Sequence, residues 1–206
     1  QSRSSAASDV YKRQMLTVSN LSVQFGKRVL FDDVNTSFVK GNCYGIIGAN
    51  GAGKSTFLKI ISKTFEPNSG SVHLDQGKRM SVLEQDHFAY DDKQVLETVI
   101  RGNKTLFKIK KEMDDIYANP DFSDNDSDRV GVLQLKYEEM DGWNAESDAA
   151  ALLSNLEIKE DLHYKEMNEL DGAQKVKVLL AQALFGNPDV LILSLIHISE
   201  PTRRRG

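Results

Sequence analysis

A glycine-rich segment in the first third of the chain most constrains its fold. Residues 48–56 read Gly-Ala-Asn-Gly-Ala-Gly-Lys-Ser-Thr, the spacing of glycine, four residues, glycine, lysine and serine. The apolar run 43–47 before it predicts a buried strand, and the apolar pattern of 57–61 predicts a helix after it. Because a strand, a glycine-rich turn and a helix aim backbone N–H groups at one point, this order predicts a phosphate-binding loop. The alternative is a glycine-rich turn without a ligand.

Composition is that of an ordinary folded domain. The chain has 206 residues, of which 40% are hydrophobic, enough for one domain with a core. No uninterrupted apolar run approaches the ~18 residues of a membrane span. The single cysteine, Cys43, excludes an intramolecular disulfide and a cysteine zinc cluster, and fits a reducing cytoplasm. The four histidines lack metal-ligand spacing and are expected to be ordinary surface or core residues.

The two ends of the sequence can be read from the two strands of one inverted DNA repeat. Residues 9–14 can be encoded by GAT GTG TAT AAG AGA CAG, whose reverse complement translates to residues 193–198. The flanking residues resemble translated transposon adapters. We therefore expect residues 1–14 and 194–206 to be non-native and Met15 to start the natural sequence, with disordered natural tails as the alternative.

Removing these ends changes the charge. The whole chain has 26 basic and 30 acidic residues, and residues 15–193 keep 20 and 28, a net charge of −8. The run Arg203-Arg204-Arg205 is therefore not interpreted as a nucleic-acid patch.

Periodicity assigns the remaining elements. Alternating apolar and polar residues predict antiparallel strands over 15–39. Further along, the patterns predict strands near 71–74 and 80–83, mostly helix over 95–165, a helix over 174–185 and a buried strand over 190–193.

The chain at this point resembles the ABC ATPase cassette, and within it the ABC-F family of soluble tandem-cassette proteins. The resemblance covers residues 15–193 and rests on five segments: the opening 15–26, Walker A at 48–56, Gln85 as the Q-loop glutamine, Leu170-Asp171-Gly172-Ala173-Gln174 in the place of the Leu-Ser-Gly-Gly-Gln signature, and the approach to Walker B over 175–193. It implies an α/β P-loop NTPase fold with an antiparallel β subdomain, a mixed or parallel core sheet, and an α-helical subdomain with a helical-hairpin insertion.

The resemblance also implies a site for ATP and Mg²⁺. Lys54 would reach the β- and γ-phosphates, while Ser55 and Gln85 would bind Mg²⁺. Phe25 would stack on adenine, and its alternative is a plain core residue of the strand. The alternative for Gln85 is a solvated loop amide. The implied nucleotide-binding residues are Phe25, Asn50, Gly51, Ala52, Gly53, Lys54, Ser55, Thr56 and Gln85. The signature residues Asp171, Gly172, Ala173 and Gln174 would close over ATP held by a partner cassette.

Two departures from the family pattern matter. Asp171 replaces the signature serine and Ala173 a glycine, and an ionised aspartate ~4 Å from a phosphate charge is repelled by ~4 kcal/mol at an effective dielectric near 20. The composite site that this signature completes is therefore expected to be weak or regulatory. After Leu193 the sequence lacks the Asp-Glu of Walker B, and Glu200-Pro201-Thr202 only imitates it within the adapter-like tail. We expect no catalytic residue in this chain, and a second cassette in the missing part of the parent protein.

The stretch between Gln85 and Leu170 favours ABC-F over a transporter subunit. Apolar residues fall at helical spacing on both sides of the polar segment 119–128, which predicts a helical hairpin over about 102–140, similar to the family's arm. The stripes are Leu106, Ile109, Met113 and Ile116, then Val130, Leu133, Tyr137 and Met140. Lys104, Lys108 and Lys111 share one face of the first helix, which indicates either contact with RNA phosphates or an ordinary solvated face.

Three function classes follow. The favoured one is a cytoplasmic ATP hydrolase acting on the ribosome as a translation factor. The second is the ATP-binding subunit of an ABC transporter, which needs a membrane partner. The third, a P-loop kinase or GTPase, is disfavoured because no Asn-Lys-x-Asp guanine motif is present.

Overall fold

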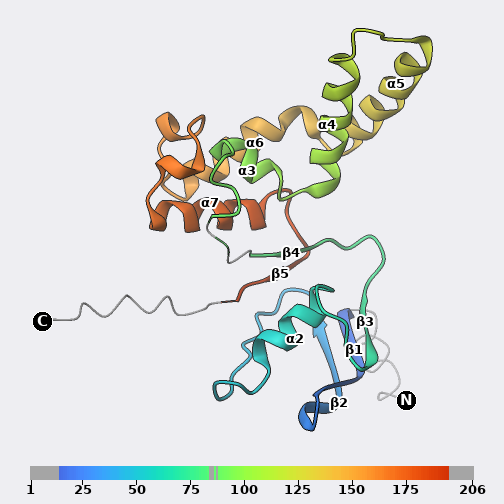
Figure 1. Ribbon diagram of the computed structural model, residues 1–206, viewed down its shortest axis with the longest axis vertical. Helices are drawn as coiled ribbons and strands as arrows, with labels where there is room; N and C mark the ends of the chain where they lie inside the picture. Colours follow the sequence, from blue (N-terminus) through green and yellow to red (C-terminus); the bar gives the residue numbers. More distant parts are fainter. Residues whose placement is uncertain (1–13, 84–85, 87, 195–206) are drawn as a thin grey trace, which may run out of the picture. The chain divides into compact units, whose positions relative to one another are not determined.

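The computed structural model describes residues 14–83, 86 and 88–194, and the chain forms two compact units (Figure 1). Of the described residues, the β unit comprises 14–82 and 189–194, and the helical unit comprises 83, 86 and 88–188. Each unit has its own hydrophobic core.

An antiparallel sheet organises the β unit. Strands β1 (Gln14–Phe25), β2 (Arg28–Val39) and β3 (Ser69–Leu74) pair in the order β2-β1-β3. The predicted antiparallel strands over 15–39 are confirmed, and β1 begins one residue earlier, at Gln14, which the sequence places in the adapter-like segment. The apolar side chains of β1 pack with helix α2 (Lys54–Ile61) through a shared set of buried residues: Leu16, Val18, Leu21, Val23, Ile60 and Ile61.

A short parallel pair closes the β unit. Strands β4 (Met80–Val82) and β5 (Val190–Ile192) lie side by side, and Ile192 joins the core. Asp189 braces this pair: its carboxylate accepts hydrogen bonds from the Arg79 N–H at 3.0 Å and from Lys78 Nζ at 3.1 Å. These bonds hold the pKa of Asp189 below its ordinary value, and the bond from the Arg79 N–H has the larger effect.

The strand predicted over 43–47 is wrong. These residues form no strand, and their apolar side chains are exposed, Ile47 at 96% and Tyr44 at 45%. A strand exists only where a neighbour supplies hydrogen bonds, and in the described part of the chain β4 and β5 pair with each other instead. Tyr44 packs edge-on against Phe38 at 4.9 Å, and its hydroxyl accepts the N–H of Val39, so the segment follows the end of β2.

Helices make up the second unit. In chain order they are α3 (Val95–Ile100), α4 (Lys104–Tyr117), α5 (Asp124–Glu139), α6 (Ala145–Asn155) and α7 (Gly172–Leu184), with short 3₁₀ turns at Gly142–Asn144, Glu160–Leu162 and Met167–Glu169. Their buried faces form one core that includes residues from all five helices. Among the described residues, no helix has the length and apolar character needed to cross a membrane.

Helices α4 and α5 form the antiparallel hairpin seen in Figure 1. The Asn103 side chain caps α4, and a reciprocal capping box between Ser123 and Asp126 begins α5. Most of the two predicted apolar stripes is buried, namely Leu106, Ile109 and Met113 on α4 and Val130, Leu133 and Tyr137 on α5. The helical interpretation of this stretch is therefore confirmed, since the 3.6-residue period places each stripe on one face.

Candidate functional site

The glycine-rich loop leads directly into helix α2. Gly53 is the N-cap residue, with φ at +93°, and it makes no side-chain cap hydrogen bond. The N–H groups of the first turn of a helix have no intrahelical acceptor, and the helix dipole makes that end attractive to anions. The loop and the start of α2 thus present the donors that a polyphosphate requires.

Lys54 places its ammonium over this loop. Its Nζ donates to the carbonyl of Gly48 at 2.7 Å and to the carbonyl of Ala49 at 2.9 Å. These bonds bend the side chain back along the loop, so the positive charge lies beside the carbonyls of Gly48 and Ala49. A bound phosphate oxygen would replace neutral carbonyl acceptors with charged ones, and charge-assisted bonds are the stronger kind.

Two neighbours on β2 shape the loop. Arg28 Nη2 donates to the Gly51 carbonyl at 2.9 Å and so ties the loop to the first residue of β2. A Cβ at Gly53 would lie 3.2 Å from Phe31 Cε1, and the positive φ at Gly53 already disfavours any other residue. Sequence reasoning predicted the glycine but missed Arg28, because no local pattern links the residue to the loop.

The remaining predicted residues of the loop lie between its turn and the first turn of α2. Asn50, Gly51 and Ala52 form the exposed turn of the loop, and Ser55 and Thr56 lie in the first turn of α2, with Ser55 exposed. A serine hydroxyl at this position is the usual protein ligand of nucleotide-bound Mg²⁺. Gln85, the second predicted metal ligand, lies outside the described residues. Within those residues, no cluster of three or more His, Cys, Asp or Glu side chains forms a metal site.

Phe25 is an exposed aromatic residue at the end of β1. It is 49% exposed, which argues against the alternative of a plain strand core residue. Its ring lies 5.8 Å from that of Phe65, tilted by 43°, and Phe65 is itself exposed. A planar base can stack on such a surface. Phe65 was not predicted, since it follows α2 in an irregular segment.

The signature residues begin α7. Asp171 is the N-cap: its carboxylate accepts the Gln174 N–H at 2.8 Å, and its own N–H donates to Gln174 Oε1 at 3.0 Å. This reciprocal capping box gives the replacement of serine by aspartate a structural role. Gly172 and Ala173 are exposed on the first turn. The carboxylate already occupies the helix end that a phosphate would approach.

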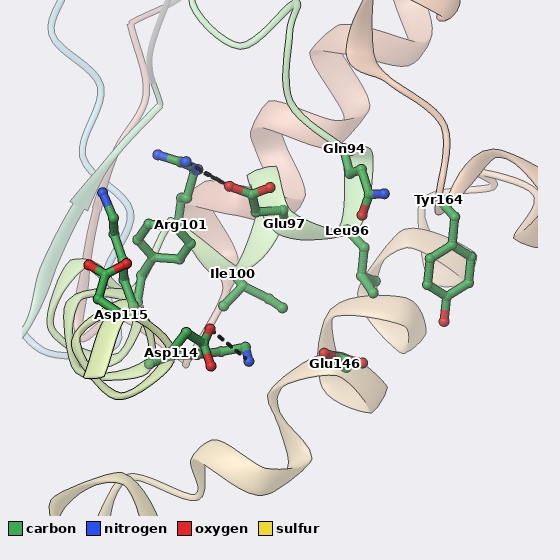
Figure 2. Close-up of a pocket in the computed structure, with 12 residues that line it drawn as sticks. Gln94, Leu96, Glu97, Ile100, Arg101, Asp114, Asp115, Glu146 and Tyr164 are labelled. Carbon is green, nitrogen blue, oxygen red and sulfur yellow. Dashed lines mark hydrogen bonds and ion pairs between the residues drawn. The ribbon is translucent and has the colours of Figure 1, made fainter. Parts of the chain in front are cut away.

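A groove of about 450 Å³ lies in the helical unit, at the base of the α4–α5 hairpin (Figure 2). Four of its charged lining residues form two ion pairs, whereas no salt bridge within the described residues joins Lys111, Asp115 or Glu146. Arg101 bonds Glu97 at 2.6 Å and stacks over the Phe107 ring at 4.3 Å, and Lys110 pairs with Asp114.

The three arm lysines are exposed on α4. Lys104, Lys108 and Lys111 point away from the buried stripe, and in the described part of the chain no salt bridge joins them to a carboxylate. Two acidic residues of α4 lie near these lysines. Asp115 lines the groove together with Lys111, and Glu112 accepts a hydrogen bond from Arg129. The exposure is compatible with both interpretations of the lysine face.

Comparison with known proteins agrees with this geometry. Residues 31–194 match the protein family described as ABC transporter. The chain is 55% identical over 188 residues to the "Uncharacterized ABC transporter ATP-binding protein YkpA" of Bacillus subtilis (strain 168), covering 91% of this chain and 34% of that protein. It is 30% identical over 190 residues to the "Energy-dependent translational throttle protein EttA" of Mycobacterium tuberculosis (strain ATCC 25618 / H37Rv), covering 90% of this chain and 32% of that protein. The chain thus spans about a third of the length of these relatives.

A solved structure shows the same fold. A nucleotide-free ATP-binding cassette from an ABC transporter superposes with a TM-score of 0.58 at 25% identity, covering 87% of this chain and 68% of the other. The fold is that of a P-loop NTPase cassette, with an antiparallel sheet and a set of helices, as predicted. The chain belongs to the ABC transporter family, and it is an ATP-binding cassette of that family.

Proposed function

We propose that this chain binds Mg·ATP through the loop over residues 48–56, with Lys54 on the β- and γ-phosphates and Ser55 on Mg²⁺. The position of Lys54 Nζ carries the proposal. Lys54 begins α2, and its Nζ lies 2.7 Å from the Gly48 carbonyl oxygen and 2.9 Å from the Ala49 carbonyl oxygen. Asn50 to Thr56 supply the phosphate donors, and Phe25 the surface for adenine. Gln85 is the proposed second metal ligand.

Titration with a fluorescent ATP analogue in the presence of Mg²⁺ tests the site. Lys54→Ala should weaken binding by at least tenfold, because a charge-assisted hydrogen bond contributes ~1.5–3 kcal/mol. Lys59→Ala is the matched control, since Lys59 lies exposed on the same helix and outside the loop. Equal affinities for the wild type and the Lys54→Ala variant would show that the nucleotide binds elsewhere.

Ser55→Ala separates the metal from the phosphates. This variant should bind the analogue in EDTA as well as the wild type does, and should lose most of the gain in affinity that Mg²⁺ gives. An unchanged response to Mg²⁺ would remove Ser55 from the metal site.

For the parent protein, we propose a cytoplasmic ABC-F ATPase that acts on the ribosome as a translation factor, with a second cassette completing the composite sites. Two observations support this proposal: the α4–α5 hairpin with its exposed lysines, and the 30% identity to a protein named as a translational throttle. The alternative is the ATP-binding subunit of an ABC transporter, which is favoured by the name of the relative that is 55% identical.

Ribosome co-sedimentation of the full-length protein distinguishes the two functions. A catalytic-carboxylate variant would hold the ATP state, and Lys104→Glu, Lys108→Glu and Lys111→Glu together should reduce co-sedimentation. The loss of phosphate contacts should also make the remaining binding less dependent on salt. The matched control carries Lys27→Glu, Lys63→Glu and Lys159→Glu, all exposed and outside the hairpin. Equal binding of both triple variants at every salt concentration would favour the solvated-face interpretation, and co-purification with a membrane subunit would favour the transporter.

A further inference from the structure

A buried lysine directly follows the signature residues. Lys175 lies in the first turn of α7 with 6% of its surface exposed. Its Nζ donates to Asp91 Oδ1 at 2.5 Å and lies 5.0 Å from the centroid of the Phe88 ring. Burial of an ammonium group is unfavourable unless the charge is paired, so Asp91 is the partner that makes this position tolerable.

The backbone near Asp91 is joined to the segment that leads into the signature. The N–H of Asn168 donates to the Asp91 carbonyl at 3.1 Å, and the N–H of Met167 donates to the Lys93 carbonyl at 2.9 Å. Two further bonds continue this pairing, from Val95 to Lys165 and from Leu96 to His163. The chain over 91–96 therefore runs hydrogen-bonded beside the chain over 163–168.

The ion pair connects the same two segments by a second route. Asp91 and Lys175 are 84 residues apart in the sequence. The Asp91 side chain bonds Lys175 in the first turn of α7, and the Asp91 backbone carbonyl accepts a hydrogen bond from Asn168, which leads into that turn. A helix start held from both sides has less freedom to rotate or fray than one held by its cap alone.

We propose that Lys175 is a positioning residue, whose ion pair with Asp91 fixes the orientation of the signature residues Asp171 to Gln174 on the helical unit. The inference rests on the proposed function in one respect, because it assigns these residues a role at the ATP of a partner cassette. The ion pair acts through the signature and does not touch nucleotide. Its predicted effect is on catalytic turnover at the composite site and on the order of the first turn of α7.

Hydrogen exchange of the chain tests the structural half without nucleotide. Lys175→Met keeps most of the apolar stem of the side chain and removes the ammonium group, with its charge and its N–H donors. Lys175→Met and Asp91→Asn should each lower the protection of the Asn168 and Gln174 amides about tenfold, the size of one charged hydrogen bond. The double variant should lose no more than either single variant, because both changes remove the same interaction.

Two comparisons make the result decisive. Lys177→Met is the matched control on the same helix, since it removes an exposed pair with Glu157 at 2.8 Å and should leave both amides unchanged. The charge exchange Asp91→Lys with Lys175→Glu should restore part of the protection. Asp91 is partly exposed, so Asp91→Asn tests the proposal even where a change at buried Lys175 disturbs folding. Unchanged protection in Asp91→Asn, or additive losses in the double variant, would overturn the proposal.

Steady-state kinetics of the full-length protein test the functional half. Lys175→Met should lower kcat with KM unchanged, whereas Lys54→Ala should weaken nucleotide binding and leave the exchange of Asn168 unaffected. A kcat equal to that of the wild type would overturn the role of Lys175 at the signature, and a failure of the ATP site would show in the Lys54 variant alone.

Discussion

Asp171 offers a quantitative test of why the signature carries a carboxylate. Asp171→Ala removes the 2.8 Å bond from the Gln174 N–H and the negative charge at the helix start. Loss of an N-cap side chain costs about 1 kcal/mol, and loss of a favourable charge at that end costs ~0.3–1 kcal/mol more. Asp171→Ser keeps a cap of similar strength and loses only the charge. The expected destabilisation is therefore about 1.5 kcal/mol for alanine and below ~1 kcal/mol for serine.

Urea unfolding followed by circular dichroism at the helical signal measures this difference. With an m-value of about 2 kcal/mol/M, the alanine variant should shift the midpoint down by about 0.7 M and the serine variant by less than about 0.5 M. If both variants shift the midpoint equally, the capping box does not account for Asp171. If serine is tolerated as expected, stability does not require the carboxylate, and its proposed repulsion of a phosphate held by a partner cassette becomes the property to explain.

Three further predictions concern activity, packing and pH. The chain alone should release no phosphate from ATP above background in a coupled phosphate assay, because Leu193 and Ser194, the residues that directly follow β5, carry no carboxylate to position water; release above background would show that a carboxylate elsewhere does so. Gly102→Ala should destabilise the helical unit by ~1–3 kcal/mol or more in thermal unfolding, since its Cβ would lie 1.8 Å from the Gln182 carbonyl oxygen, whereas Gly131→Ala, which meets no atom, should be neutral or stabilising. The Arg79 N–H, first, and Lys78, second, lower the pKa of Asp189 in the folded chain. The stability that Asp189 contributes is therefore complete above the unfolded pKa of about 3.9 and is lost as the pH falls through the lower folded pKa. Asp189→Asn should remove this part of the pH dependence of the free energy of unfolding, measured by denaturant titration at a series of acidic pH values.

Local signals in the sequence were sufficient for much of this fold. The phosphate loop is marked by glycines at fixed positions. Each helix of the hairpin is marked by apolar residues that recur with the helical period within its own sequence. The capping box also has a local signal, since Asp171 is followed three residues later by Gln174, although the sequence interpretation considered only its charge.

Features that depend on distant partners were not predictable. The apolar run 43–47 has the composition of a buried strand, but pairing is decided by neighbours that the run itself does not encode. The bond from Arg28 to the loop and the pair between Asp91 and Lys175 join segments far apart in the chain. Charged residues are common on surfaces, so composition gave no reason to expect that Lys175 is buried.

The division of the chain has a consequence for how it folds. The helical unit is continuous in sequence, whereas the β unit is completed only when β5 pairs with β4, more than a hundred residues after β4 has been made. Long-range pairing of this kind is slow because loop closure must precede the contacts that stabilise it. During synthesis the helical unit can therefore collapse first and bring β4 and β5 together. Tyr44 and Ile47 stay exposed in the completed β unit, so the pairing of β4 with β5 does not shield them from association with other chains.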